Sequence, residues 1–244
     1  MLFRSAGITP ELMTTPLEED AAGDTDVAKV DWDELLERKT VLAVGPGLGQ
    51  QPGAERFLLE LMERVRVSMV LDADALNIVA RHKDKLGGGG RTLVLTPHPG
   101  EMARLAGISI KEVQANREKL AREFAVKHRV TLVLKGWRTL VAHPDGEVAV
   151  NTTGTPALAK GGSGDILTGI VAAMVAQHPD RVKDAVNAAV YLHGLAAEIA
   201  TREQDEHTLL ATDVVEHLCR AFRFNAEDEG GYVWLASRPG AARR

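Results

Sequence analysis

Four short runs of apolar residues, none of them alternating with polar positions, recur along residues 40–134. They cover Thr40–Val44, Val67–Leu71, Thr92–Leu95 and Val130–Leu134, and helical spacing separates most of them. Strands that are apolar at every position are typical of a parallel sheet, because the connecting helices bury both of its faces. The pattern predicts an α/β fold with a mostly parallel central sheet and helices on both faces.

Each apolar run ends in glycine, proline or a cluster of polar residues. The segments that follow the runs are Gly45–Gly49, Asp72–Asp74, Thr96–Glu101 and Lys135–Gly136. Ligands bind at the carboxyl edge of open α/β sheets, so four such ends predict a binding site there. The spacing matches neither the GxGxxG fingerprint of dinucleotide-binding folds nor the GxxxxGK[ST] phosphate loop. The pattern therefore predicts the place of the site and leaves its ligand open.

Helical periodicity predicts further elements between and after the strands. Apolar spacing indicates helices at Glu55–Arg66, Lys183–Arg202 and Asp213–Phe224, with Thr212 as the expected cap of the last one. Between them, Thr139–Ala142 and Glu147–Val150 flank an Asp-Gly turn, which predicts a β-hairpin.

The chain then enters a glycine-rich turn, Lys160–Asp165, that leads into a helix. Leu167, Ile170, Val171 and Met174 have the spacing of a buried helical face. Glycines permit a close backbone approach, and the start of a helix attracts anions, so the turn suits a phosphate. Asp165 has two interpretations at this point, because aspartate is also a preferred helix cap. It either caps the helix or carries chemistry beside a bound phosphate.

Composition and charge exclude several classes of protein. The chain has 244 residues, a formal net charge of −5 at pH 7 and one cysteine, Cys219. The acidic balance argues against a nucleic-acid partner, and a single cysteine excludes an intramolecular disulfide and a cysteine-rich metal site. The sequence contains neither an apolar run long enough to span a membrane nor a signal peptide, so a cytoplasmic location without a membrane partner is expected.

Four motifs in order resemble the ADP- or ATP-dependent NAD(P)H-hydrate dehydratases, which have a ribokinase-like fold. These motifs are Asp72–Asn77, Thr96–Glu101, Lys135–Thr139 and Gly161–Asp165. The resemblance implies that the S epimer of hydrated NADH or NADPH (NADHX or NADPHX) loses water while ADP or ATP is hydrolysed. It implies an adenine nucleotide with Mg²⁺ as cofactor and no metal bound by the protein alone. A homo-oligomer is the candidate assembly, because family members often form one.

The resemblance also implies roles for individual residues. Asp165 corresponds to the probable catalytic acid or base, beside the hydrated nicotinamide. The expected nucleotide contacts are Lys135, Gly136, Trp137, Arg138, Thr139 and Gly164. The expected substrate contacts are Gly47, His98 and Asp165, with Asn77 as a further candidate. The turn residues Gly162, Ser163 and Gly164 would form an anion hole.

Other interpretations of the polar residues stay open. His98 lies between two prolines, where it could contact a ligand or only stiffen the turn. Asp72 and Asp74 could cap a helix, although a supporting role behind the substrate is favoured. His193 is followed by Gly194 in an alanine-rich segment, which favours packing between helices over catalysis.

The beginning of the chain departs from the family pattern. Family members carry a first strand, a glycine-rich turn and a helix before the segment that matches Pro10–Thr14. The expectation is one domain over residues 1–224 that lacks this first βα unit, with a loose tail at 225–244. Such a chain would expose a sheet edge, which predicts poor solubility or weak activity. The alternatives are a kinase resembling hydroxyethylthiazole or hydroxymethylpyrimidine kinases, and an inactive truncated nucleotide binder.

Overall fold

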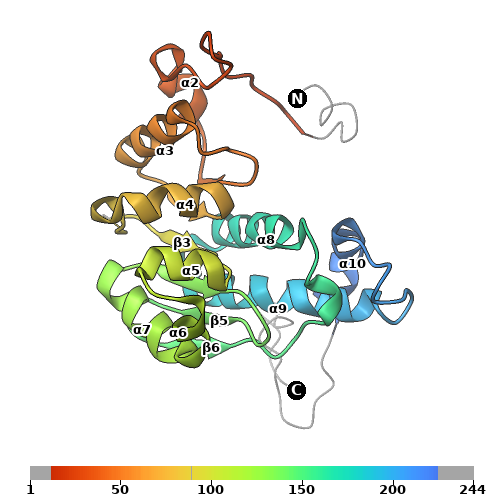
Figure 1. Ribbon diagram of the computed structural model, residues 1–244. Helices are drawn as coiled ribbons and strands as arrows, with labels where there is room; N and C mark the ends of the chain where they lie inside the picture. Colours follow the sequence, from red (N-terminus) through yellow and green to blue (C-terminus); the bar gives the residue numbers. More distant parts are fainter. Residues whose placement is uncertain (1–11, 89, 225–244) are drawn as a thin grey trace.

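The computed structural model describes residues 12–88 and 90–224, which form a six-stranded sheet between two layers of helices (Figure 1). The strands are β1 (Val41–Val44), β2 (Ser68–Leu71), β3 (Leu93–Leu95), β4 (Thr131–Leu134), β5 (Leu140–Ala142) and β6 (Val148–Val150). The α-helices are α2 (Trp32–Leu36), α3 (Pro52–Arg64), α4 (Ala73–Arg81), α5 (Pro99–Ala106), α6 (Ile110–Ala115), α7 (Arg117–His128), α8 (Ser163–Gln177), α9 (Val182–Ala200) and α10 (Ala211–Arg223).

The strands lie side by side in sequence order, from β1 to β6. Strands β1 to β4 are parallel, and β5 and β6 add two antiparallel strands. The four apolar runs and the hairpin are therefore confirmed as strands. Strand β1 forms one edge of the described sheet, and its Ala43 is exposed.

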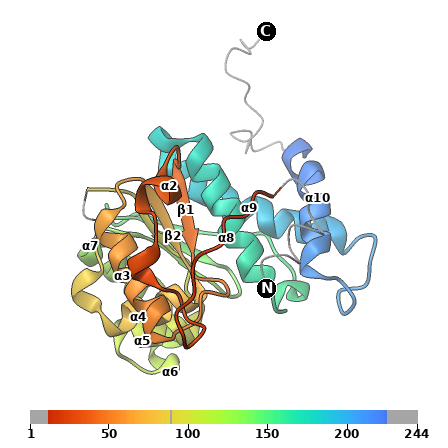
Figure 2. The ribbon, with the colours of Figure 1, turned by 90° about the horizontal axis from the view of Figure 1, so that it is seen from above.

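The two faces of the sheet carry different side chains and different helices. In β2 to β4 the larger residues face α3, α4, α5 and α7, as Leu71, Leu95 and Leu134 do. The intervening valines, such as Val70 and Val133, face α8 and α9. Figure 2 shows the sheet edge-on between these two layers. Successive side chains of a strand point to opposite faces, so each residue of a fully apolar strand is buried on one side or the other.

Helix starts differ from the sequence prediction at two places. Helix α3 begins at Pro52 rather than Glu55, because a proline suits the first helical position, where its missing N–H is not needed. Helix α10 begins at Ala211, so the prediction of Thr212 as its cap is wrong. The carboxylate of Asp213 accepts the N–H of Leu210 instead, at 2.7 Å, and Thr212 lies inside the first turn.

The region before β1 packs on the outer side of α3. Trp32 of α2 stacks on Phe57 of α3, with ring centroids 5.4 Å apart, and the Arg64 guanidinium lies over the Trp32 ring. The segment 225–244, expected to be a loose tail, lies outside the described residues. No helix in the described part of the chain has the length and apolar character that spanning a membrane requires.

Candidate active site

Polar residues from the ends of neighbouring strands meet at the carboxyl edge of the sheet. Asp72 follows β2 and Lys135 follows β4, and the Lys135 ammonium lies 2.7 Å from the Asp72 carboxylate. Asp72 is 1% exposed, so its charge needs a close partner, and Lys135 supplies one. Asp72 occupies the N-cap position of α4 but makes no side-chain cap bond, so the pair with Lys135 replaces the capping interpretation.

Thr168 ties helix α8 to this pair. Its hydroxyl donates to the second carboxylate oxygen of Asp72 at 2.7 Å. The hydroxyl of Thr96, which follows β3, lies 3.4 Å from the Thr168 hydroxyl. Thr96 and Thr168 are both buried, and three strand ends are thereby joined to the first turns of α8. Buried polar groups linked in this way fix the start of α8 against the sheet edge.

The start of α8 offers free amide groups beside the Lys135 ammonium. Gly162 takes the N-cap position with a φ of +87°, and no side chain caps the helix. Among the described residues, no backbone carbonyl accepts the N–H of Gly164 or Asp165. A Cβ atom on Gly164 would lie 3.2 Å from Lys135 Nζ, so the ammonium and the helix start share one space. Unpaired amides, the helix dipole and an ammonium together suit a phosphate.

Asp165 stands at this helix start without a partner in the described structure. It is exposed, and no hydrogen bond or ion pair with another residue of 12–88 or 90–224 engages its carboxylate. The N-cap position belongs to Gly162, so the interpretation of Asp165 as the cap is not supported. Its carboxylate is therefore free to act on a bound ligand.

The segment after β4, expected to contact the nucleotide, is held by an arginine that sequence reasoning missed. Arg117 of α7 donates to the carbonyl of Trp137 at 2.7 Å and, more weakly, to those of Leu134 and Arg138. Trp137 is 82% exposed, and the Arg138 guanidinium lies 4.9 Å from the centre of its ring. An exposed aromatic ring beside cationic groups is a surface on which a nucleobase can stack.

Within the same segment, Gly136 and Thr139 shape the turn. The Thr139 hydroxyl donates to the Gly136 carbonyl at 3.1 Å, which closes the turn between β4 and β5.

The expected substrate contacts come from the ends of β1 and β3. Gly47 follows β1 and is exposed. His98 caps α5, and its Nδ1 accepts the N–H of Gly100 at 2.9 Å. Glu101 accepts the His98 backbone N–H at 2.8 Å, and burial raises the pKa of the Glu101 carboxyl. His98 therefore stiffens the turn, as one interpretation proposed, while its half-exposed ring still faces solvent.

Asn77 lies within α4, five residues after the N-cap residue Asp72, and not at the end of a strand. It lines a cavity of about 490 Å³ between α4 and α5, together with Gln50, Ala80, Arg81 and Arg104. Asp74 supports the same region, because its carboxylate accepts the N–H of Gly49 at 3.0 Å and the side-chain amide of Gln50 at 2.8 Å.

Helix α9 packs against the glycine turn through His193. His193 is 7% exposed and lies against the backbone of Ser163, and burial lowers the pKa of the His193 imidazole to about 4. Next to it, a Cβ atom on Gly194 would lie 2.3 Å from the Thr153 hydroxyl oxygen, so Thr153 packs directly on the helix backbone. The expectation that this pair serves packing agrees with their positions.

The described residues contain no cluster of three His, Cys, Asp or Glu side chains that could hold a metal ion.

Comparison with known proteins shows the family. Residues 4–220 match the family model described as NAD(P)H-hydrate dehydratase. The bifunctional NAD(P)H-hydrate repair enzyme Nnr of Moorella thermoacetica is 43% identical over 226 residues, which are 91% of this chain and 42% of that protein. The ADP-dependent (S)-NAD(P)H-hydrate dehydratase of Bacillus subtilis is 40% identical over 190 residues, which cover 78% and 66% of the two chains. The chain thus spans less than half of the bifunctional relative.

Solved structures agree with the fold. The crystal structure of the ADP/ATP-dependent NAD(P)H-hydrate dehydratase of Bacillus subtilis, co-crystallised with ATP/Mg²⁺, has a TM-score of 0.66 at 38% identity, covering 75% of this chain and 64% of that one. A ribokinase-like superfamily protein of Enterococcus faecalis has a TM-score of 0.67 at 28% identity, covering 78% and 65%. The expected ribokinase-like α/β fold is confirmed. The chain belongs to the NAD(P)H-hydrate dehydratase family.

Proposed function

We propose that this chain dehydrates the S epimer of hydrated NADH or NADPH to the reduced cofactor, at the expense of ADP or ATP. The observation that carries the proposal is the Asp165 carboxylate, unpaired among the described residues, at a helix start without a side-chain cap that also faces the Lys135 ammonium. A carboxylate beside an anion cradle suits proton removal from a hydroxyl that attacks a phosphate. The expected contacts of Lys135–Thr139 with the nucleotide, and of Gly47, His98 and Asn77 with the hydrate, belong to this proposal.

The chemistry follows from the poor leaving ability of a hydroxyl. Asp165 takes the hydroxyl proton while the oxygen forms a bond to the terminal phosphorus of the nucleotide, and the phosphoanhydride bond breaks. The amides of the Gly162–Asp165 turn stabilise charge on the transferring phosphoryl group, and those of Gly164 and Asp165 have no carbonyl acceptor among the described residues. The phosphate then leaves carbon with the electron pair of its C–O bond. Loss of a proton from the adjacent carbon restores the ring double bond.

The residues present fit an adenine nucleotide that brings its own metal ion. Mg²⁺ in nucleotide sites is bound by one or two carboxylates together with phosphate oxygens and water. Asp72 is already paired with Lys135 and Asp165 is assigned to the hydroxyl proton, so phosphate oxygens and water would supply most of the ligands of this ion. Mg²⁺ would neutralise phosphate charge at this helix start.

The test replaces the proposed base. Asp165→Asn is expected to keep nucleotide binding and lose turnover by about 100-fold or more, because general bases contribute that much. Asp180→Asn is the matched control, since Asp180 is exposed just beyond the other end of α8. The assay follows recovery of reduced-nicotinamide absorbance from the hydrate with ADP or ATP.

The possible results separate the candidates. Near-normal turnover in Asp165→Asn would refute the role of this residue. A phosphorylated alcohol formed from ATP, without recovery of NAD(P)H, would favour the kinase alternative, and nucleotide binding without turnover of any hydrate would favour an inactive binder. A homo-oligomeric assembly and a cytoplasmic location remain predictions from the sequence.

A further inference from the structure

The cavity between α4 and α5 is lined by two positively charged side chains. Its lining consists of two guanidinium groups, two amide side chains and Ala80, from residues Gln50, Asn77, Arg81 and Arg104. A cavity of about 490 Å³ whose lining carries two guanidinium groups and no carboxylate suits an anion.

Arg104 supplies a charge that no carboxylate among the described residues compensates. Its Nη1 donates to Asn77 Oδ1 at 2.9 Å. Within the described ranges, none of the ion pairs includes Arg104. The Asn77 carbonyl orients the guanidinium without neutralising it, so the other N–H groups of Arg104 are available to a ligand.

Arg81 reaches the cavity from α4, whereas Arg104 belongs to α5. It donates to Gln50 Oε1 at 3.4 Å and pairs with Glu55, which also contacts His82. The hydrogen bonds from Arg81 and His82 lower the pKa of the Glu55 carboxyl, so Glu55 stays ionised and keeps Arg81 in place. Asp74 holds the amide of Gln50 in the same way. Neither carboxylate lines the cavity, so both act as supports behind it.

The cavity adjoins the half of the site assigned to the substrate. Gln50 lies three residues after Gly47, and Arg104 lies on the helix that His98 caps. At 1.5 Å per residue, Arg104 is about 9 Å along α5 from His98, a distance that the ribose and phosphate groups of a dinucleotide can span. The segment assigned to the adenine nucleotide, which includes Lys135, follows β4, two strands along the sheet from β2, which α4 follows.

We propose that Arg104 and Arg81 bind a phosphate group of the pyridine dinucleotide in this cavity, with Asn77 as the residue that positions Arg104. The identity of the ligand rests on the proposed function. Two phosphate sources share this chemistry: the pyrophosphate, which NADHX and NADPHX both contain, and the ribose phosphate that only NADPHX has. The oxygens of either phosphate can accept two parallel hydrogen bonds from the N–H groups of a guanidinium.

The test measures binding and does not depend on turnover. NADH and NADPH, the stable products, are titrated into the chain by calorimetry, and ADP is titrated separately. Arg104→Gln is expected to weaken dinucleotide binding at least about 10-fold, the effect of losing a charge-assisted pair. Asn77→Asp is expected to weaken it similarly, because a carboxylate of the same size would neutralise Arg104. Arg38→Gln is the control with the same charge change.

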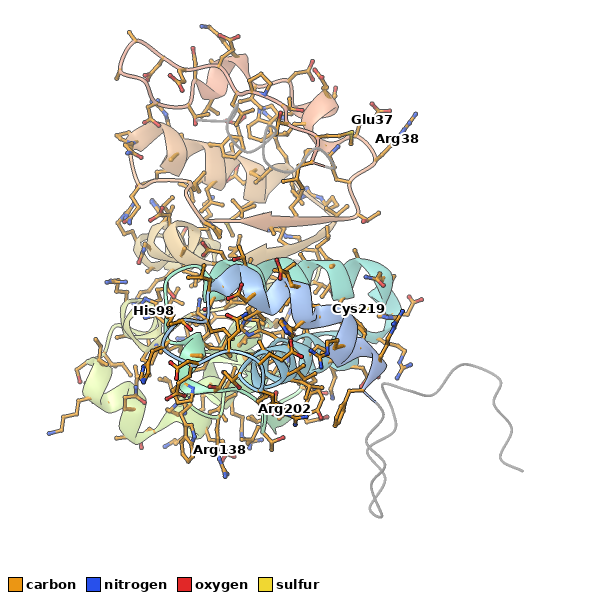
Figure 3. The ribbon with its side chains drawn as sticks, turned by 90° about the vertical axis from the view of Figure 1, so that its right-hand side faces the viewer. Glu37, Arg38, His98, Arg138, Arg202 and Cys219 are labelled. Carbon is orange, nitrogen blue, oxygen red and sulfur yellow. The ribbon has the colours of Figure 1, made fainter. Side chains whose placement is uncertain are left out.

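The control residue is suitable because it lies far from the cavity. Arg38 precedes β1 at the amino end of the strands, and its side chain is 89% exposed. Figure 3 shows Arg38 and His98 on opposite sides of the molecule.

Each result has a distinct meaning. A loss confined to NADPH identifies the ribose phosphate as the ligand group, and an equal loss for NADH and NADPH identifies the pyrophosphate. Unchanged dinucleotide affinity in both variants, an equal loss of ADP affinity, or no dinucleotide binding by the unmodified chain would overturn the inference. Dinucleotide binding that depends on Arg104, without turnover of the hydrate, would contradict the proposed function and leave this inference standing.

Discussion

Replacement of His193 by glutamine is expected to change how the stability of the protein depends on pH. His193 is 7% exposed, its Nε2 has no hydrogen-bond partner in the described part of the chain, and burial lowers its pKa to about 4. In the unfolded chain a histidine has a pKa of about 6.5. Between these two values the unfolded state binds a proton that the folded state does not. Stability is therefore lost as the pH falls through this window and is fully present above it.

The size of the effect follows from the two pKa values. Between pH 7 and pH 5 the difference in proton binding at His193 removes about 2 kcal/mol of unfolding free energy. His193→Gln has no proton to bind at this position, so its stability should fall by about 2 kcal/mol less over the same interval. Urea unfolding at both pH values measures this, and subtraction of the two proteins cancels the titration of every other group.

The control separates titration from simple loss of packing. Val190→Ala removes two methyl groups from a buried position of the same helix α9 and alters no titrating group. It is expected to be less stable at both pH values but to retain the wild-type pH dependence. Equal losses between pH 7 and pH 5 for the wild type and His193→Gln would refute the assignment of a buried, neutral imidazole.

Two further substitutions test the contacts around the site. Lys135→Met leaves the Asp72 carboxylate buried without its cation and should lower the free energy of unfolding by about 3 kcal/mol. Addition of Asp72→Asn should recover part of this loss, as measured by urea unfolding. A loss below about 1 kcal/mol would contradict the buried pair. Gly194→Ala should cost about 2 kcal/mol, because its Cβ would meet Thr153 at 2.3 Å. Gly169→Ala, whose Cβ would meet nothing within 4 Å, should instead raise the melting temperature.

The architecture could be predicted from the sequence because each strand has a recognisable local pattern of apolar residues. A strand buried on both faces has to be apolar at every position, and Val67–Leu71 shows this without reference to the rest of the chain. The first residues of the helices were harder to predict. The start of α10 depends on which residue presents its N–H to Asp213, and Thr212, the better cap by residue type, lies one position too late.

The contacts of the supporting residues of the site could not be predicted, because their partners are distant in the sequence. Asp72 contacts Lys135, 63 residues later, and Thr168, 96 residues later. Before those contacts are known, an aspartate ahead of a helix has the same local sequence as an ordinary cap. Arg117 and Arg104 carried no motif at all, since an arginine on a surface helix is common. Only the fold reveals that one holds the segment after β4 and the other faces a cavity.

Lys160, immediately before the glycine turn, works as a non-covalent cross-link. Its ammonium donates to the carbonyls of Glu206, His207 and Leu209, at 3.0, 2.7 and 2.7 Å. These carbonyls belong to the segment that leads into α10, so the contact closes a long loop that contains both α8 and α9. The entropic cost of closing such a loop grows only slowly with its length, so a contact between distant segments costs little more than one between near segments. The entry to the glycine turn is thereby coupled to the α9–α10 connection, so a displacement of one segment would break hydrogen bonds that hold the other.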